Sequence, residues 1–120
     1  MNGFLQVSTG CIKGILNNQL EMTGIELIAK ERQHQIDKHG FTGEHHANHP
    51  EWYDDNQMID AASLLVEPDI SGNVWYPKNW DSHWFYDLCR RSHKERLIIA
   101  GALIASEIDR LNNLENEQHN

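Results

Sequence analysis

The stretch Lys94–Leu111, KERLIIAGALIASEIDRL, decides how the rest of this chain must fold. Its middle part, Leu97–Ala105, is apolar at every position, so a helix formed there has no side that suits water. Small residues such as Gly101 and Ala105 allow neighbouring helices to approach closely. We therefore predict a helix over 92–113 that lies at the centre of the domain or in an oligomer interface.

A second helix is predicted over 24–38 by the signals at its two ends. Thr23 and Glu26 have the spacing of a capping box, in which a hydroxyl and a carboxylate each bind a free amide of the first turn. Gly40 is the residue type that most often ends a helix in the left-handed conformation. These two signals fix the limits of the helix better than its periodicity does.

Polar residues project toward the apolar side of this helix, where a buried group needs a partner or a metal. They are Glu31, Arg32 and Gln35. Glu31 is either a metal ligand or the partner of Arg96 or Arg32, and we favour the ion pair. Arg32 is equally suited to gripping a phosphate and to pairing with Glu107.

The middle of the chain predicts less regular structure. Residues 41–55 are rich in His, Asn and Gly and indicate a loop, in which His45 and His49 are more simply solvated residues than zinc ligands. A helix is predicted over 56–66, capped by Asp54 or Asp55, and a short helix begins near Asp81 or Ser82. No strand-like alternation occurs, so the predicted class is all-α, a three- to four-helix bundle with a central apolar C-terminal helix.

Length and composition favour one small domain. The chain has 120 residues, of which 39% are hydrophobic, and its longest apolar run is about half of what a bilayer requires. We predict a loosely structured extension over 1–21, a single helical domain over 22–113 and a frayed tail over 114–120. Cys11 and Cys89 are isolated, which argues against a disulfide framework or structural zinc and favours the reducing cytoplasm.

The charge balance bears on the class of ligand. With 18 acidic and 10 basic residues the net charge is -8, so direct DNA binding is disfavoured. The basic residues cluster only weakly, around Arg90, Arg91, Lys94 and Arg96. A nucleotide bridged to the protein by a divalent cation fits this balance better.

Aromatic residues gather around Pro77, in the stretch Asn73–Tyr86. Such a cluster either stacks a nucleobase or forms a satellite core under a long loop, and we favour the satellite core. Its members are Trp75, Tyr76, Trp80, Trp84, Phe85 and Tyr86.

Two segments carry a resemblance to known families. TGIELIAKERQHQIDKHGFTGEHH, Thr23–His46, resembles the opening of small phage and prophage proteins of the type ERxRQ…GWTxEH, and Lys94–Leu111 resembles their last helix. Those proteins are distantly similar to the MazG-like, all-α nucleoside triphosphate pyrophosphohydrolases. The resemblance covers roughly 22–66 and 90–112, and it implies a cytoplasmic protein of a bacterial host and a homodimer.

The same resemblance implies a site and a reaction. It implies that Glu31 and Glu95 are catalytic and hold magnesium while a nucleoside triphosphate is hydrolysed to monophosphate and pyrophosphate. The resemblance further places a metal ligand where Ile98 stands, and an acidic pair where Gln57 and Asp60 stand. The implied substrate-binding residues are Arg32, Gln35, Lys94, Trp80 and Trp84.

These departures leave a second function open. The chain is either such an enzyme, which the departures could make catalytically degenerate, or a non-catalytic helical module that binds a host protein or a nucleotide. In the second case the same polar residues form a structural network.

Overall fold

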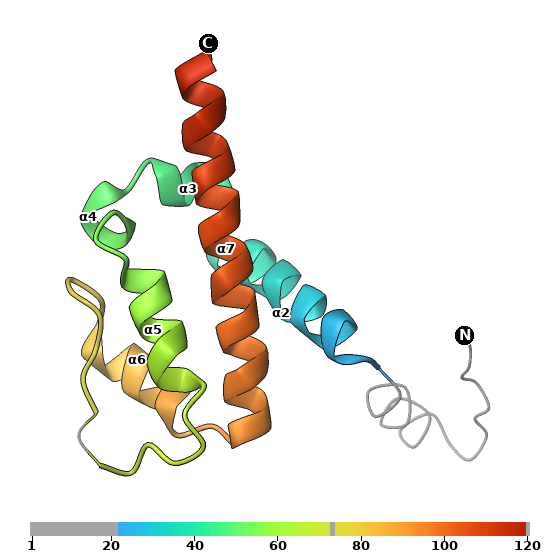
Figure 1. Cartoon of the computed structure of the whole chain (residues 1–120), viewed down its shortest axis with the longest axis vertical. Coiled ribbons are helices and arrows are strands. Elements are labelled where there is room, and N and C mark those ends of the chain that lie inside the picture. Colours follow the sequence, from blue (N-terminus) through green and yellow to red (C-terminus); the bar gives the residue numbers. More distant parts are fainter. Residues whose placement is uncertain (1–21, 73, 120) are drawn as a thin grey trace.

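The computed structural model describes residues 22–72 and 74–119, and these residues form helices and loops without any strand (Figure 1). The predicted all-α class is therefore confirmed, whereas the predicted extension over 1–21, with Cys11, lies outside the described residues. Within the described part, no helix combines the length and hydropathy that crossing a membrane requires. The helices are α2 (Gly24–His39), α3 (Gly43–Ala47), α4 (Pro50–Tyr53), α5 (Gln57–Leu65), α6 (Ser82–Cys89) and α7 (His93–His119).

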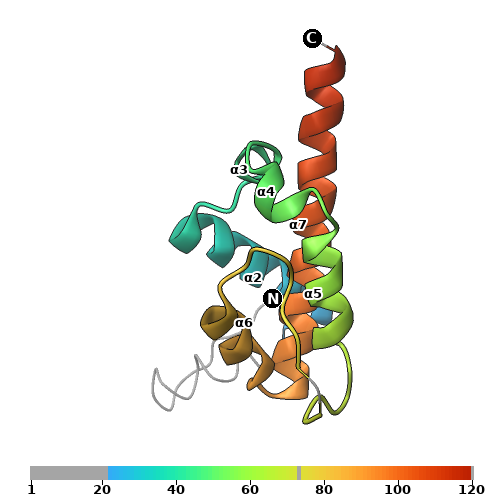
Figure 2. The ribbon, with the colours of Figure 1, turned by 90° about the vertical axis from the view of Figure 1, so that its left-hand side faces the viewer.

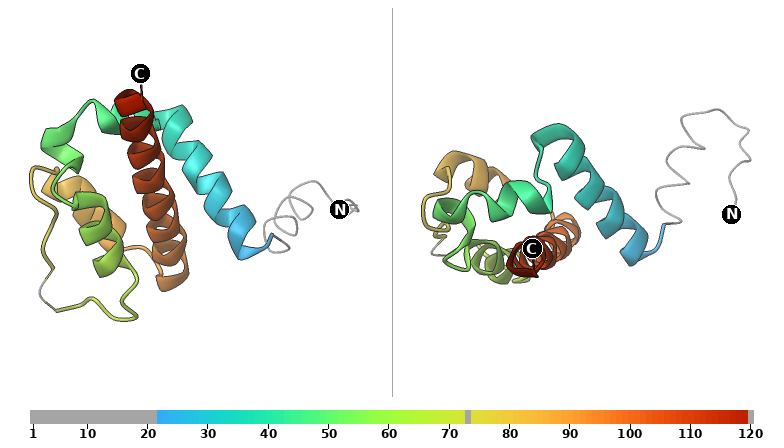
Figure 3. Two further views of the ribbon diagram at one scale, coloured as in Figure 1. Left: turned by 45° about the horizontal axis from the view of Figure 1, so that its top comes forward. Right: turned by 90° about the horizontal axis from the view of Figure 1, so that it is seen from above.

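Helix α7 is the element on which the others are assembled, as its apolar sequence predicts. It contacts α5, α3 and α2, and α5 and α2 lie on opposite sides of it (Figures 1 and 3). Its residues Ile99, Ala100 and Leu103 join the core. The core also contains Tyr53, Met58, Ala61, Ala62, Leu64, Leu65, Phe85 and Leu88.

The predicted central place of α7 is confirmed, but the described residues leave part of its apolar surface uncovered. Leu97 and Ile104 are exposed, and so are Ile108 and Leu111 farther along the helix. The other helices are too few and too short to surround a helix of 27 residues. An interface between two copies of the chain stays a prediction.

Helix α7 is also longer than predicted. It continues through His119, and its last turns extend beyond the other helices (Figures 1 and 2), so the predicted end at residue 113 is wrong, whereas the frayed tail over 114–120 stays a prediction. The residues after 113 include Leu, Glu and Gln, which favour helix, and the stretch to 119 contains no Gly or Pro to stop it.

The predicted ends of α2 are confirmed. Thr23 Oγ1 accepts a hydrogen bond from the Glu26 amide, the Glu26 carboxylate accepts one from the Thr23 amide, and Gly40 has the left-handed φ of 69°. The amide of Gly40 donates back to carbonyls of the last turn, including that of Ile36. This turn sends the chain directly into Phe41 and α3.

The stretch 41–55, predicted to be a loop, contains two short helices. Thr42 caps α3 by accepting a hydrogen bond from the His45 amide, and Pro50 occupies the start of α4, where its missing N–H costs nothing. Gly43 lets α3 lie against α7, because a Cβ atom there would be 2.7 Å from the carbonyl oxygen of Asp109.

Helix α5 matches its predicted range of 56–66 within one residue at each end, but its start differs. Neither Asp54 nor Asp55 caps it; Asn56 precedes it with a left-handed φ of 63° and no side-chain capping bond. The buried side chain of Gln57 accepts a hydrogen bond from the Asp55 amide at 2.7 Å instead. The predicted helix near Asp81 or Ser82 is confirmed as α6, capped by Asp81.

Candidate functional site

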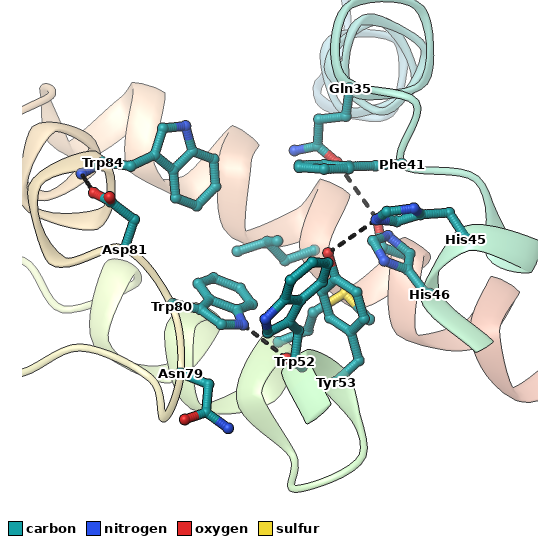
Figure 4. Close-up of a pocket in the computed structure, with 13 residues that line it drawn as sticks. Gln35, Phe41, His45, His46, Trp52, Tyr53, Asn79, Trp80, Asp81 and Trp84 are labelled. Carbon is teal, nitrogen blue, oxygen red and sulfur yellow. Dashed lines mark hydrogen bonds between the residues drawn. The ribbon is translucent and has the colours of Figure 1, made fainter. Parts of the chain in front are cut away.

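A cavity of about 590 Å³ opens between α6 on one side and the α2–α4 segment on the other (Figure 4). Five aromatic rings line it, and the polar groups among them include two imidazoles and the side chains of Gln35 and Ser106. This is the usual composition of a small-molecule site, which is mostly apolar with a few placed polar groups. The rings are those of Phe41, Trp52, Tyr53, Trp80 and Trp84, and the imidazoles are those of His45 and His46.

Hydrogen bonds from the loop before α6 hold the two sides of the cavity together. Trp80 Nε1 donates to the Trp52 carbonyl at 2.7 Å, and Asn79 Nδ2 donates to the Glu51 carbonyl at 2.8 Å. The Asp81 carboxylate accepts from the amide of Trp84 and fixes the start of α6. Hydrogen bonds from side chains to backbone carbonyls therefore join segments that are far apart in the sequence and shape the cavity.

The rings face one another without filling the space between them. The Trp80 and Trp84 ring centroids are 5.9 Å apart, and Phe41 and Trp84 are 6.5 Å apart and nearly perpendicular. Trp52 and Trp84 remain partly exposed to solvent. A planar ligand could therefore reach these rings and stack on them.

The predicted aromatic cluster is divided by the fold, so the satellite-core interpretation holds only in part. Phe85 is fully buried in the core, and Trp80 packs against it, whereas Trp75 and Tyr76 are exposed. Trp80 and Trp84 line the cavity, as the prediction that they contact a base requires. Sequence reasoning missed Phe41, Trp52, Tyr53 and His46, which lie in or beside the short helices that were predicted to be loop.

Three titratable side chains of the cavity wall, those of His45, His46 and Tyr53, favour their neutral forms. Burial, with the nearby charge of Arg32, lowers the pKa of His46 to about 3. Burial also lowers the pKa of His45 and raises that of Tyr53 to about 12. The Tyr53 hydroxyl lies 3.4 Å from His45 Nε2. At neutral pH these groups can exchange hydrogen bonds with a ligand but add no charge.

Glu31 and Glu95, the predicted catalytic and metal-binding residues, line a different cavity, one of about 320 Å³ between α2 and the start of α7. A smaller cavity of about 120 Å³ shares Glu31 with this one and shares Gln35 and Trp84 with the aromatic cavity. The smallest cavity therefore lies between the other two and adjoins each of them. They place the carboxylates at one end and the aromatic rings at the other.

The residues at the carboxylate end do not fit a preformed magnesium site. Glu95 Oε1 accepts hydrogen bonds from the amide and the hydroxyl of Ser92, which caps α7, and these bonds lower the pKa of Glu95. Lys30 and Arg91 line the same cavity and would repel a cation. Among residues 22–72 and 74–119, no three His, Cys, Asp or Glu side chains are grouped so as to hold a metal ion.

The ion pairs predicted for Glu31 are wrong. Glu31 accepts a hydrogen bond from Gln35 Nε2 at 3.4 Å, and Arg96 instead donates to backbone carbonyls at the end of α5, among them that of Leu65. The backbone at the end of this helix needs donors, and the guanidinium supplies them. Sequence patterns give no sign of such side-chain to backbone pairing.

Arg32 is also engaged differently from the prediction. It pairs with Asp109 rather than with Glu107, which is bound by Arg110 at 2.7 Å. Its Nη1 donates to the Phe41 carbonyl at 2.7 Å, so its predicted contact with substrate would require these bonds to break. Lys94, the other predicted phosphate ligand, is exposed on the first turn of α7.

Gln57 and Asp60 stand where the resemblance places an acidic pair, and the structure gives them other surroundings. Gln57 Nε2 donates to the carbonyls of Glu51 and Lys78, which joins α4 to the loop before α6. Asp60 is exposed on α5. Neither residue therefore adds a carboxylate to the cavity that contains Glu31.

No family model matches the chain, and no curated protein or solved structure is significantly similar to it. The resemblance to MazG-like enzymes stays a prediction. The chemistry of the adjoining cavities is what remains to indicate a function.

Proposed function

We propose that the protein binds a nucleotide without hydrolysing it, with the base in the cavity lined by Trp52, Trp80 and Trp84. The observation that carries this proposal is the open aromatic wall, which adjoins a cavity with basic side chains. The aromatic cavity has a volume of about 590 Å³, which lies within the range of small-molecule sites. Aromatic rings stack on any nucleobase, and each stacked base gains about 1–3 kcal/mol.

The phosphate end is expected along the smaller adjoining cavity. Arg91, His34 and His39 line that cavity, and Lys30 lines the next one. The charges of Arg91 and Lys30 can offset locally the repulsion that Glu31, in the same cavities, and the net charge of -8 exert on a phosphate. In this orientation the phosphates point away from Asp81, which lies on the far side of the aromatic cavity (Figure 4).

The absence of hydrolysis is proposed because Glu95, one of the two acidic residues of the cavity that contains Glu31, has a structural task. Glu95 caps α7 through Ser92, and Ile98, which lines the same cavity, offers no ligand atom where the resemblance places one. Magnesium is commonly held in nucleotide sites by carboxylates together with the phosphates. Here one of the two carboxylates is committed to the end of its own helix.

A second candidate is the pyrophosphohydrolase that the resemblance implies. The observation in its favour is that Glu31 and Glu95 line one cavity although they are 64 positions apart in the sequence, and that a second cavity shares lining residues with both this cavity and the aromatic one. A cytoplasmic location in a bacterial host, which is also a proposal, would give either protein access to nucleotides.

Calorimetric titration of the full chain with AMP, GMP, CMP and UMP tests the proposal. We expect at least one of them to bind, and we expect Trp84→Ala to weaken that binding about tenfold or more. Trp75→Ala is the matched control, because Trp75 is exposed outside the cavity, and it should bind as the wild type does. Absence of binding to all four, or equal effects of the two variants, would contradict the proposal.

Pyrophosphate release from the corresponding triphosphates with magnesium separates the two candidates. Binding without release supports the non-catalytic protein. Magnesium-dependent release that disappears in Glu31→Gln, while binding of the monophosphate persists, would establish the hydrolase instead. Glu26→Gln is the control, since Glu26 lies on the same helix but belongs to its capping box.

A further inference from the structure

His46 is an unusual residue in the wall of the aromatic cavity. It is 2% exposed, and neither Nδ1 nor Nε2 has a hydrogen-bond partner within the described protein. A neutral imidazole carries one donor and one acceptor, and buried polar groups are nearly always satisfied. An unsatisfied side chain in a ligand-sized cavity indicates that a group outside residues 22–72 and 74–119 completes its bonding.

The surroundings of His46 explain why the described residues offer its ring nitrogens no hydrogen-bond partner. Its ring packs against Tyr53 with centroids 4.2 Å apart and faces Phe41 at 5.6 Å, so aromatic faces and edges occupy much of its contact surface. The Tyr53 hydroxyl is 3.4 Å from the neighbouring His45. The two nearby cationic side chains, those of Arg32 and Arg110, form ion pairs with Asp109 and Glu107, respectively.

We infer that His46 selects the ligand by its heterocyclic edge: the cavity takes a neutral, planar ring with a hydrogen-bond donor or acceptor directed at the imidazole. The inference rests on the proposed function and assigns the recognition of the base within it. Because either tautomer of the imidazole can form, His46 accepts from an exocyclic amino group of the base or donates to an exocyclic carbonyl. A ring edge that carries only C–H groups offers His46 no hydrogen bond and is therefore not selected.

Two substitutions separate recognition from structure. His46→Leu introduces an apolar side chain of similar size and removes both ring nitrogens. His46→Gln retains a donor and an acceptor. We expect His46→Leu to bind the preferred nucleoside monophosphate about tenfold or more weakly, since an unpaired polar edge of the ligand would then be buried. We expect His46→Gln to recover at least part of that loss.

The second arm changes the ligand. If the preferred ligand is a purine, the probe is purine riboside 5′-monophosphate, which lacks the 6-substituent; if a pyrimidine, it is the analogue without the 4-substituent. Wild type should bind the probe about tenfold more weakly than the parent ligand, and His46→Leu should bind the two within about threefold of each other. Equal discrimination by wild type and His46→Leu would overturn the inference.

Stability without ligand provides the third arm. A structural histidine would lower the melting temperature when replaced, whereas an unsatisfied one should not, so unliganded His46→Leu should melt at or above the wild-type temperature. A lower melting temperature, with binding unchanged, overturns the inference alone. Failure of the wild type to bind any nucleotide overturns the proposed function as well, so the two failures are distinguishable.

Discussion

Arg32 on α2 and Asp109 on α7 are 77 residues apart in the chain, and the Arg32 guanidinium holds the Asp109 carboxylate through Nη2 at 2.8 Å and Nε at 3.0 Å. The same guanidinium donates to the carbonyl of Phe41 at 2.7 Å. One buried side chain thus ties α2, α7 and the start of the aromatic cavity together. The predicted pairing with Glu107 would have placed these elements differently.

Replacing Arg32 should therefore destabilise the fold. We expect Arg32→Met to lower the free energy of unfolding by about 2–3 kcal/mol, because the Phe41 carbonyl and the Asp109 carboxylate lose their donor. Urea denaturation measures the change. The matched control is Lys78→Met, whose ion pair with Asp55 is exposed, with side chains 69% and 65% accessible. The control should change the free energy by less than about 0.5 kcal/mol, and equal effects would contradict the assigned role of Arg32.

Gly43 should not tolerate a side chain. An added Cβ would lie 2.7 Å from the Asp109 carbonyl oxygen and 3.0 Å from its carbon, and backbone atoms inside a helix cannot move aside. We expect Gly43→Ala to cost about 2 kcal/mol or more. Gly24→Ala is the control, because a Cβ atom added there would meet no other atom within 4 Å and α2 gains a better helix former. Thermal melting that ranks the two variants the other way would refute this packing.

The buried His46 should make stability depend on pH below neutrality. Its folded pKa of about 3 is lower than the ordinary value of 6.5, so the unfolded chain binds the proton first as the pH falls. As the pH falls from 6.5 toward 3, protonation of this histidine in the unfolded chain lowers the free energy of unfolding, by up to about 1.4 kcal/mol per pH unit. Denaturation of wild type and His46→Leu at pH 7 and pH 5 checks this. The wild type should lose more stability than the variant, and parallel losses would show that His46 is not the group responsible.

The capping role of Glu95 can be separated from any role in catalysis. Ser92→Ala removes the hydroxyl that accepts a hydrogen bond from the Glu95 amide and should lower the free energy of unfolding by about 1 kcal/mol. Glu95→Gln keeps an acceptor for Ser92 and should change stability and nucleotide affinity little. Circular dichroism melting and calorimetry measure both variants. A large loss of nucleotide affinity in Glu95→Gln, with the melting temperature unchanged, would show that Glu95 takes part in nucleotide binding.

The sequence predicted the long helices because their signals are local. The capping box of Thr23 and Glu26 and the left-handed Gly40 each act within a few residues, and the structure confirms both. It also confirms the predicted start of a short helix near Asp81 or Ser82. The helices α3 and α4 were missed since four or five residues are too few to show periodicity, although Thr42 offered a start signal.

The cavity was only partly predictable. Gln35, Trp80 and Trp84 were expected to contact a ligand, but His46 and Tyr53 reach the cavity through the two missed helices. Pairings such as Arg32 with Asp109 depend on how helices cross, which no single segment encodes. Composition indicated polar residues in need of partners and left the identity of those partners to tertiary packing.

The most direct measurement of the central claim is the response of the four tryptophan indole N–H signals to nucleotide in a ¹H–¹⁵N correlation spectrum. Single Trp→Phe variants assign the signals. The stacked base should shift the resonances of Trp52, Trp80 and Trp84 by its ring current and leave that of Trp75, outside the cavity, in place. Saturable shifts confined to the three cavity residues are the predicted result. No shifts, or shifts of Trp75 alone, would contradict binding of a base in this cavity.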